Sequence, residues 1–143
     1  MNLKVISGAQ FPREVIPLIN SAKSSLNLVV FDWRWYANDP GASCQLFNQS
    51  IIRAVRRGVQ VRIIASSLDI VNIFNKLGAK AKKIQTKRLL HCKLLTIDDK
   101  IVVTGSHNYT KSAFQYNLEL SVIISNHPEI ASFVQFFNNL WSK

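Results

Sequence analysis

The residues with the clearest chemical potential lie between His91 and Asn108, where an imidazole, an ammonium, a hydroxyl and a carboxamide follow at short spacing. His91 and Lys93 are two positions apart in a segment, 91–98, that is typical of a β-strand, so both side chains should point to the same face. Ser106 and Asn108 follow the next apolar segment, which a tight turn should fold back beside the first. Ammonium and carboxamide groups donate hydrogen bonds to phosphate oxygens, and histidine can act as nucleophile or as acid and base. These residues therefore favour phosphodiester chemistry.

Alternating helices and strands must position these groups. Helical periodicity is present at 12–22, 43–57 and 69–77 and after Pro128, and strand-like segments are present at 25–33, 59–65, 91–98, 101–104 and 119–125, with a weaker one at 79–85. Alternation of this kind is typical of an α/β fold. We expect a single domain, residues 1–143, with a mixed, mostly parallel sheet sandwiched between helices.

The chain is strongly basic, with 18 Lys and Arg against 8 Asp and Glu and a formal net charge of +10. Such a field favours a polyanionic partner, either nucleic acid or an anionic membrane surface. Segment 70–97 contains seven of the cations and no carboxylate. Candidate substrate contacts are therefore Lys83, Lys87 and Arg88 in this segment and Arg34 and Trp35 after the first strand. Packing in the core or at a dimer interface is the alternative for the tryptophan.

Metal chemistry is disfavoured by the scarcity of acidic residues. Two-metal nucleases need several carboxylates around ions about 4 Å apart, whereas Asp98-Asp99 is the only adjacent acidic pair among the eight acids. Cys44 and Cys92 do not form a metal-binding motif. We expect no metal and no other cofactor.

Neither a secretory signal nor a membrane span is indicated by the sequence. The first residues lack a long apolar run, and no later stretch approaches the roughly 18 apolar residues that a spanning helix needs. If the chain is complete, we expect a cytoplasmic protein without stable membrane insertion.

The spacing of the polar residues resembles the signature of the phospholipase D superfamily, HxK(x)4D(x)6GSxN. Every position of that signature is matched, by His91, Lys93, Asp98, Gly105, Ser106 and Asn108. The likeness is greatest to the small bacterial nucleases of the superfamily, which carry one such motif per chain. The resemblance implies a phospholipase D-like fold and a reaction through a covalent phosphohistidine.

The resemblance also implies roles for individual residues. His91 would be the nucleophile, and the phosphate would be held by Lys93, Ser106 and Asn108. Glu119 lies where these nucleases place a carboxylate that hydrogen-bonds the catalytic histidine. Asp98 and Gly105 would be structural, and the strand parity of Asp98 independently points its side chain away from His91. His107 occupies a variable position and is at most a rim or substrate contact, with a plain surface role as the alternative.

A chain with one motif supplies one catalytic histidine, whereas the chemistry uses one to attack and one to protonate the leaving oxygen. The resemblance therefore implies a homodimer in which a second copy completes the site across a twofold axis. We expect a metal-independent endonuclease that cleaves DNA or RNA. The alternatives are a phospholipase or phosphatidyltransferase and a non-catalytic dimer that binds nucleic acid.

Overall fold

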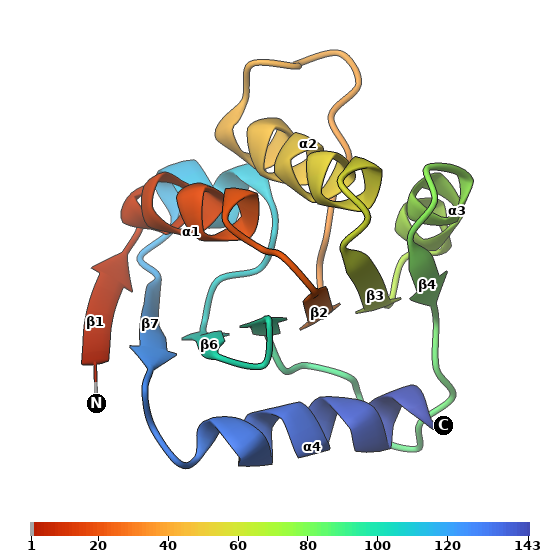
Figure 1. The fold of residues 1–143 in the computed structure, drawn as a ribbon. Helices are drawn as coiled ribbons and strands as arrows, with labels where there is room; N and C mark the ends of the chain where they lie inside the picture. The colour runs from red at the N-terminus through yellow and green to blue at the C-terminus, as the bar shows by residue number, and fades with distance from the viewer. Residues whose placement is uncertain (1) are drawn as a thin grey trace.

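A seven-stranded mixed sheet lies between two layers of helices in the computed structural model, which describes residues 2–143 (Figure 1). The strands, in spatial order, are β1 (Asn2–Ser7), β7 (Leu120–Ser125), β6 (Ile101–Gly105), β5 (Leu94–Ile97), β2 (Ser25–Val30), β3 (Gln60–Ala65) and β4 (Lys80–Lys82). One face is covered by α1 (Gln10–Asn20), α2 (Ser43–Arg56) and α3 (Leu68–Lys76), and the other by α4 (Ile130–Trp141). The predicted sandwich of helices around a mixed sheet is confirmed.

The prediction that the sheet is mostly parallel is wrong. Only the β2–β3 and β3–β4 pairs among residues 2–143 are parallel, and the other four pairs are antiparallel. Helical crossovers produce the parallel pairs, whereas β5 and β6 form a hairpin and β7 returns antiparallel to β6. Strand β1, which was not predicted, adds a further antiparallel pair at the edge.

Most elements begin and end within about two residues of the predicted bounds, but two differences affect the site. Strand β5 begins at Leu94, so His91 and Lys93 lie in the segment that leads into the strand. A short π-helix, η1 (Ser112–Tyr116), follows the end of the motif and was not predicted.

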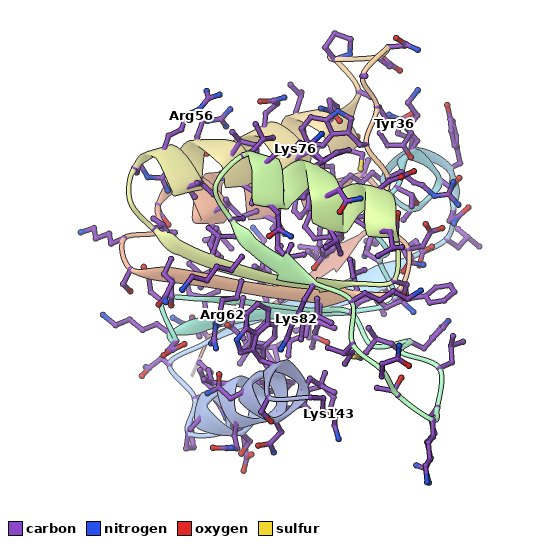
Figure 2. All side chains as sticks on the ribbon, turned by 90° about the vertical axis from the view of Figure 1, so that its right-hand side faces the viewer. Tyr36, Arg56, Arg62, Lys76, Lys82 and Lys143 are labelled. Atoms are coloured by element: carbon purple, nitrogen blue, oxygen red, sulfur yellow. The ribbon has the colours of Figure 1, made fainter. Side chains whose placement is uncertain are left out.

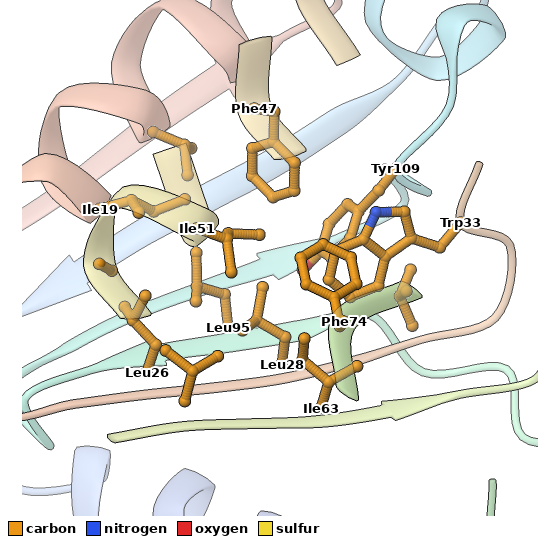
Figure 3. Close-up of a cluster of buried hydrophobic side chains, with 14 of the residues drawn as sticks. Ile19, Leu26, Leu28, Trp33, Phe47, Ile51, Ile63, Phe74, Leu95 and Tyr109 are labelled. Atoms are coloured by element: carbon orange, nitrogen blue, oxygen red, sulfur yellow. The ribbon is translucent and has the colours of Figure 1, made fainter. Parts of the chain in front are cut away.

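The core is divided by the sheet into two apolar clusters. The larger one lies under α1, α2 and α3, and Figure 3 shows part of it around Leu28, Phe47 and Phe74. The smaller one lies under α4 and includes Val29 of β2 and Phe137 of α4. Leu28 and Val29, which are successive residues of β2, therefore enter opposite clusters, so this central strand is buried on both faces. The buried strand gives the residues at its end a rigid base.

Candidate active site

The motif residues other than Asp98 gather at one edge of the sheet, where β2 ends, β5 begins, β6 ends and β7 begins. The strand register produces this meeting, because Leu94 pairs with Val29 on one side and with Thr104 on the other. Gly105, at the end of β6, pairs with Ser121 near the start of β7. Residues far apart in the sequence therefore become neighbours at this edge.

His91 and Lys93 contact each other directly. The Lys93 ammonium lies 3.0 Å from His91 Nδ1 and donates a 2.8 Å hydrogen bond to the His91 carbonyl oxygen. The imidazole also packs on the Phe31 ring, with 4.9 Å between the ring centroids. His91 is otherwise exposed to solvent. An imidazole supported on one side and open on the other is suited to contact a substrate.

Asn108 is held beside the end of β2. The backbone N–H of Asp32 donates to Asn108 Oδ1 at 3.1 Å, and the backbone of Tyr109 exchanges hydrogen bonds with Asp32 and Arg34. These contacts place Asn108 next to the residue that follows Phe31, on which His91 packs. Because the carboxamide oxygen is engaged, its NH₂ group is the end that can donate to a phosphate.

Ser106 and Glu119 form a second polar group at the same edge. The Ser106 hydroxyl donates to Glu119 Oε1 at 2.5 Å and accepts from the backbone N–H of Leu120 at 3.0 Å. Asn117 donates to Glu119 Oε2 at 3.0 Å. The hydrogen bonds of the Glu119 carboxylate within residues 2–143 thus come from Ser106 and Asn117, and the expected bond to His91 is not formed within one chain.

Gly105 allows β6 to approach β7 unusually closely at this point. A Cβ atom on Gly105 would lie 2.4 Å from the Ser121 Cα atom and 2.5 Å from the Leu120 carbonyl oxygen. Its φ of +156° is also one that side-chain-bearing residues rarely adopt. The missing side chain therefore brings Ser106 within reach of Glu119.

Asp98 lies at the opposite end of β5 from His91 and anchors the segment that leads into β2. Its carboxylate accepts hydrogen bonds from the backbone N–H groups of Lys23, Ser24 and Ser25 and from the Ser24 hydroxyl. Burial by itself raises the pKa of Asp98, but these hydrogen bonds to the charged form outweigh it, so the pKa is lowered. The carboxylate is thus engaged in holding the backbone.

The prediction that His107 lies at the rim or on the surface is wrong. The ring is 1% exposed and stacks on Phe11, with 4.6 Å between centroids. Its Nε2 lies 3.0 Å from the Gly8 carbonyl oxygen, and its Nδ1 lies 2.7 Å from the Ser121 hydroxyl. The carbonyl can only accept, so Nε2–H donates to Gly8 and Nδ1 accepts from Ser121. Burial lowers the pKa of His107, which favours this neutral ring and leaves no nitrogen for a substrate.

The predicted substrate contacts line two hollows at this edge. Arg34 and Trp35 line one of about 920 Å³ between residues 31–35 and the length of α3, which we call the α3 hollow. Lys83, Lys87 and Arg88 line another of about 460 Å³ formed by residues 83–90 over the end of β3, which we call the basic hollow.

Some cationic side chains of the chain are exposed to solvent, whereas others pack against aromatic rings inside the fold. Lys83, Lys87 and Arg88 are exposed. Arg62 and Lys82, in contrast, lie between the sheet and α4, with their charged ends over the Trp141 ring at 5.5 and 4.4 Å (Figure 2). Part of the positive charge is therefore used inside the fold, whereas Lys83, Lys87 and Arg88 line the hollow that includes Phe31, on which His91 packs.

Several residues of the site had no signal in the sequence. Phe31 and Asp32 reach the motif residues His91 and Asn108 through the strand pairing, and Asn117 reaches Glu119 through the turn after η1. Trp33, next to them, is buried in the core and donates through Nε1 to Asn48.

Two further properties concern the part of the chain that the structure describes. Within residues 2–143, no three His, Cys, Asp or Glu side chains are grouped so that they could hold a metal ion. None of the helices found there has the length and apolar character needed to cross a membrane.

The family model described as "Cardiolipin synthase, PLD-like domain" matches residues 15–141. The chain therefore belongs to the phospholipase D-like family, as the motif predicted. The match covers every motif residue described above.

Proteins of similar sequence carry names that refer to lipids. A mitochondrial cardiolipin hydrolase of Mus musculus is 29% identical over 129 residues, which are 86% of this chain and 54% of that protein. A phospholipase D of Rickettsia conorii is 33% identical over 110 residues, 73% of this chain and 55% of that protein. The chain thus spans about half the length of these relatives.

Solved structures show the same fold. Nuc of Salmonella typhimurium, described as a phospholipase D family member, has a TM-score of 0.82 at 23% identity and covers 99% of this chain and 95% of its own. NucT from Helicobacter pylori has a TM-score of 0.80 at 19% identity, with 99% and 96% covered.

Proposed function

We propose that the chain is a metal-independent nuclease that cleaves DNA or RNA through a covalent bond to His91. The observation that carries this proposal is the basic hollow, whose three exposed cations lie without a lining carboxylate and which shares Phe31 with the His91 imidazole. A phosphate backbone is the polyanion that neutralises such a row of charges. The net charge of +10 also attracts a polyanion, and it does so over a longer range.

In the proposed reaction the His91 imidazole attacks the phosphorus atom while the bond from phosphorus to the leaving oxygen breaks. Lys93 and the Asn108 NH₂ group donate to the non-bridging oxygens and stabilise the charge that develops there. Ser106 has its hydroxyl hydrogen on Glu119, so it contributes by positioning that carboxylate. A second imidazole protonates the leaving oxygen, and water then hydrolyses the phosphohistidine.

The second imidazole is proposed to come from a second copy of the chain. Three apolar residues beside Glu119 support this, because Tyr116, Leu118 and Leu120 are 76%, 103% and 58% exposed. An isologous dimer that buries them would place Glu119 of one copy toward His91 of the other. That arrangement agrees with the absence of a hydrogen bond between these two residues within one chain.

The nuclease proposal is tested with EDTA-treated protein on single-stranded DNA, duplex DNA and RNA. We expect cleavage that persists in EDTA, a labelled oligonucleotide that becomes attached to the protein, and a loss of at least about a thousand-fold in His91→Gln. His127→Gln, near the start of α4, is the matched control and should cleave normally. No cleavage of any nucleic acid, or equal cleavage by His91→Gln, would refute the proposal.

The dimer is tested by light scattering on Leu118→Arg. We expect a monomer whose activity is largely lost, because a charge at the centre of an apolar interface is strongly unfavourable. Leu46→Arg is the matched control, since Leu46 is a 48% exposed leucine on α2. A Leu118→Arg monomer with full activity would show that the site is complete in one copy.

A lipid phosphodiesterase is the second candidate, and one observation favours it. A mostly apolar hollow of about 370 Å³ lies against α4, lined by Cys92, Leu94, Phe133 and Phe136 among others. Cys92 stands between His91 and Lys93 in sequence, so an acyl chain in this hollow would lie near a phosphate at the site. Faster hydrolysis of cardiolipin vesicles than of any nucleic acid, with loss on Phe136→Asp, would support this candidate.

A further inference from the structure

The α3 hollow and the basic hollow meet beside His91. Phe31 and Ser66 line both of them, and the His91 imidazole rests on the Phe31 ring. A phosphate attacked by His91 therefore lies where the two hollows join. A nucleic-acid strand bound there would continue into one hollow on each side of the scissile phosphate.

The two hollows differ sharply in charge. Lys83, Lys87 and Arg88 line the basic hollow without an acidic residue. The α3 hollow is lined by two cations and two carboxylates, namely Arg34, Lys76, Asp32 and Asp69. Arg34 is moreover bound to Asp32 at 2.8 Å, and this hydrogen bond and charge raise the pKa of Arg34. The α3 hollow thus has little net charge to offer a phosphate.

The remaining lining of the α3 hollow is suited to a nucleobase. Trp35 is half-buried and fixed edge-on against Phe74, with 5.9 Å between centroids, so its indole is a preformed apolar surface. Asn72 is exposed on α3, where its carboxamide can donate to and accept from a base edge. Stacking on an aromatic ring combined with amide hydrogen bonds is how proteins bind unstacked bases.

We propose that the α3 hollow binds an unpaired base of the nucleotide next to the scissile phosphate, while the basic hollow holds the backbone on the other side. This inference rests on the proposed nuclease function and adds its substrate class, a single-stranded nucleic acid. A base inside a duplex is stacked and its pairing edge is occupied, so it must be flipped out before it can enter the hollow. The enzyme therefore prefers single strands and discriminates between bases at one flanking position.

The proposal is tested by binding, in the His91→Gln background, so that the result does not depend on cleavage. The probe is a short fluorescent single-stranded DNA, compared with the same strand carrying one abasic site at each position in turn. We expect one abasic position to weaken binding at least about five-fold, the lower end of the effect of losing one base–aromatic stack. A duplex of the same sequence should bind more weakly than the single strand.

Substitutions assign the effect to each hollow. Asn72→Ala, at an exposed position, should weaken binding of the intact strand and so reduce the difference in affinity between the intact and the abasic strand. Trp35→Ala should have the same effect more strongly. The double substitution Lys87→Ala and Arg88→Ala should weaken binding of the intact and the abasic strand equally. It should also lower the slope of log affinity against log salt by about 1.4, at roughly 0.7 for each phosphate that is no longer neutralised. Asn38→Ala, in the loop before α2, is the matched amide control and should bind like the parent.

Three results would overturn the base-binding proposal: equal affinity for intact and abasic strands, equal or tighter binding of the duplex, or Asn72→Ala and Trp35→Ala variants that bind like the parent. Because Trp35→Ala removes packing against the core, its folding is checked by circular dichroism, and Asn72→Ala decides the outcome if the tryptophan variant unfolds. Binding without cleavage by the wild type would refute the nuclease function alone, whereas no binding to any nucleic acid would refute both.

Discussion

Replacing Asp98 by asparagine should destabilise the fold through a defined set of hydrogen bonds. The carboxylate accepts from the N–H groups of Lys23, Ser24 and Ser25 and from the Ser24 hydroxyl at distances of 2.7 to 3.2 Å. Asparagine tolerates the φ of +54° at this position, so the backbone conformation is not a second cause of change. Any loss of stability in the variant is thus caused by the loss of the negative charge and of one acceptor oxygen.

The expected cost is about 2–4 kcal/mol. Hydrogen bonds to a charged group contribute about 1.5–3 kcal/mol and neutral ones about 0.5–1.5 kcal/mol, so neutralisation weakens each bond by about 1 kcal/mol. Asparagine has one acceptor oxygen where aspartate has two, so its NH₂ group would face one of the backbone donors. Partial exposure of Asp98 to solvent keeps the total below the sum of the individual bonds at full strength.

Urea unfolding of Asp98→Asn at several pH values is the appropriate assay. The pKa of Asp98 is lowered in the folded state, so its contribution is fully present above the ordinary value of 3.8 and is lost as the pH falls through the folded-state value. The difference between wild type and variant should therefore shrink in acid. Asp99→Asn is the matched control, with a φ of +53° and no anchoring role, and should cost less than about 0.5 kcal/mol. Equal stability of the two variants at pH 7 would refute the reasoning.

Two further predictions concern residues that hold the edge of the sheet. Gly105→Ala should cost about 3 kcal/mol in thermal unfolding, because the new Cβ atom meets Ser121 at 2.4 Å, whereas Gly41→Ala meets no atom within 4 Å and should be nearly neutral. A small effect of Gly105→Ala would show that the strands separate easily. His107→Gln should reduce the loss of stability that the protein undergoes on acidification. Because the pKa of His107 is lowered in the folded state, its contribution to stability is complete above the ordinary value of 6.5 and decreases as the pH falls toward the folded-state value. Urea midpoints at pH 7.5 and 5.5 measure this, and an unchanged difference between wild type and variant would contradict it.

The fold was largely predictable wherever local periodicity carries the information. The stripe of Phe47 and Ile51 predicts α2. The two-residue spacing of His91 and Lys93 predicts side chains on the same face of a strand, and the two residues do contact each other, although they precede β5. The direction of the strands was harder to predict, because strands joined by a short hairpin and strands joined by a helical crossover are similar apolar segments in the sequence. Strand β1 was missed since its exposed, alternating residues form a strand only against β7.

Polar residues of the site were predictable only as far as the motif extends. His107 looks like a surface residue in sequence, but its partner Gly8 lies 99 positions away and buries it. The support of His91 by Phe31 depends likewise on the pairing of β2 with β5. Contacts of this kind depend on tertiary structure, and no local spacing records them.

The contact between Lys93 and His91 determines which nitrogen of the imidazole carries hydrogen before a substrate arrives. An ammonium group only donates, so Nδ1 accepts from Lys93, and a neutral His91 ring has its hydrogen on Nε2. In this tautomer Nε2 carries the hydrogen and the Nδ1 lone pair is engaged by Lys93, so neither nitrogen is free to attack phosphorus. The proposed reaction therefore requires Lys93 to leave Nδ1 for the oxygens of the arriving phosphate, which frees a ring lone pair for the attack. The substrate would then activate its own nucleophile, and the ring would be unreactive in the absence of a phosphate.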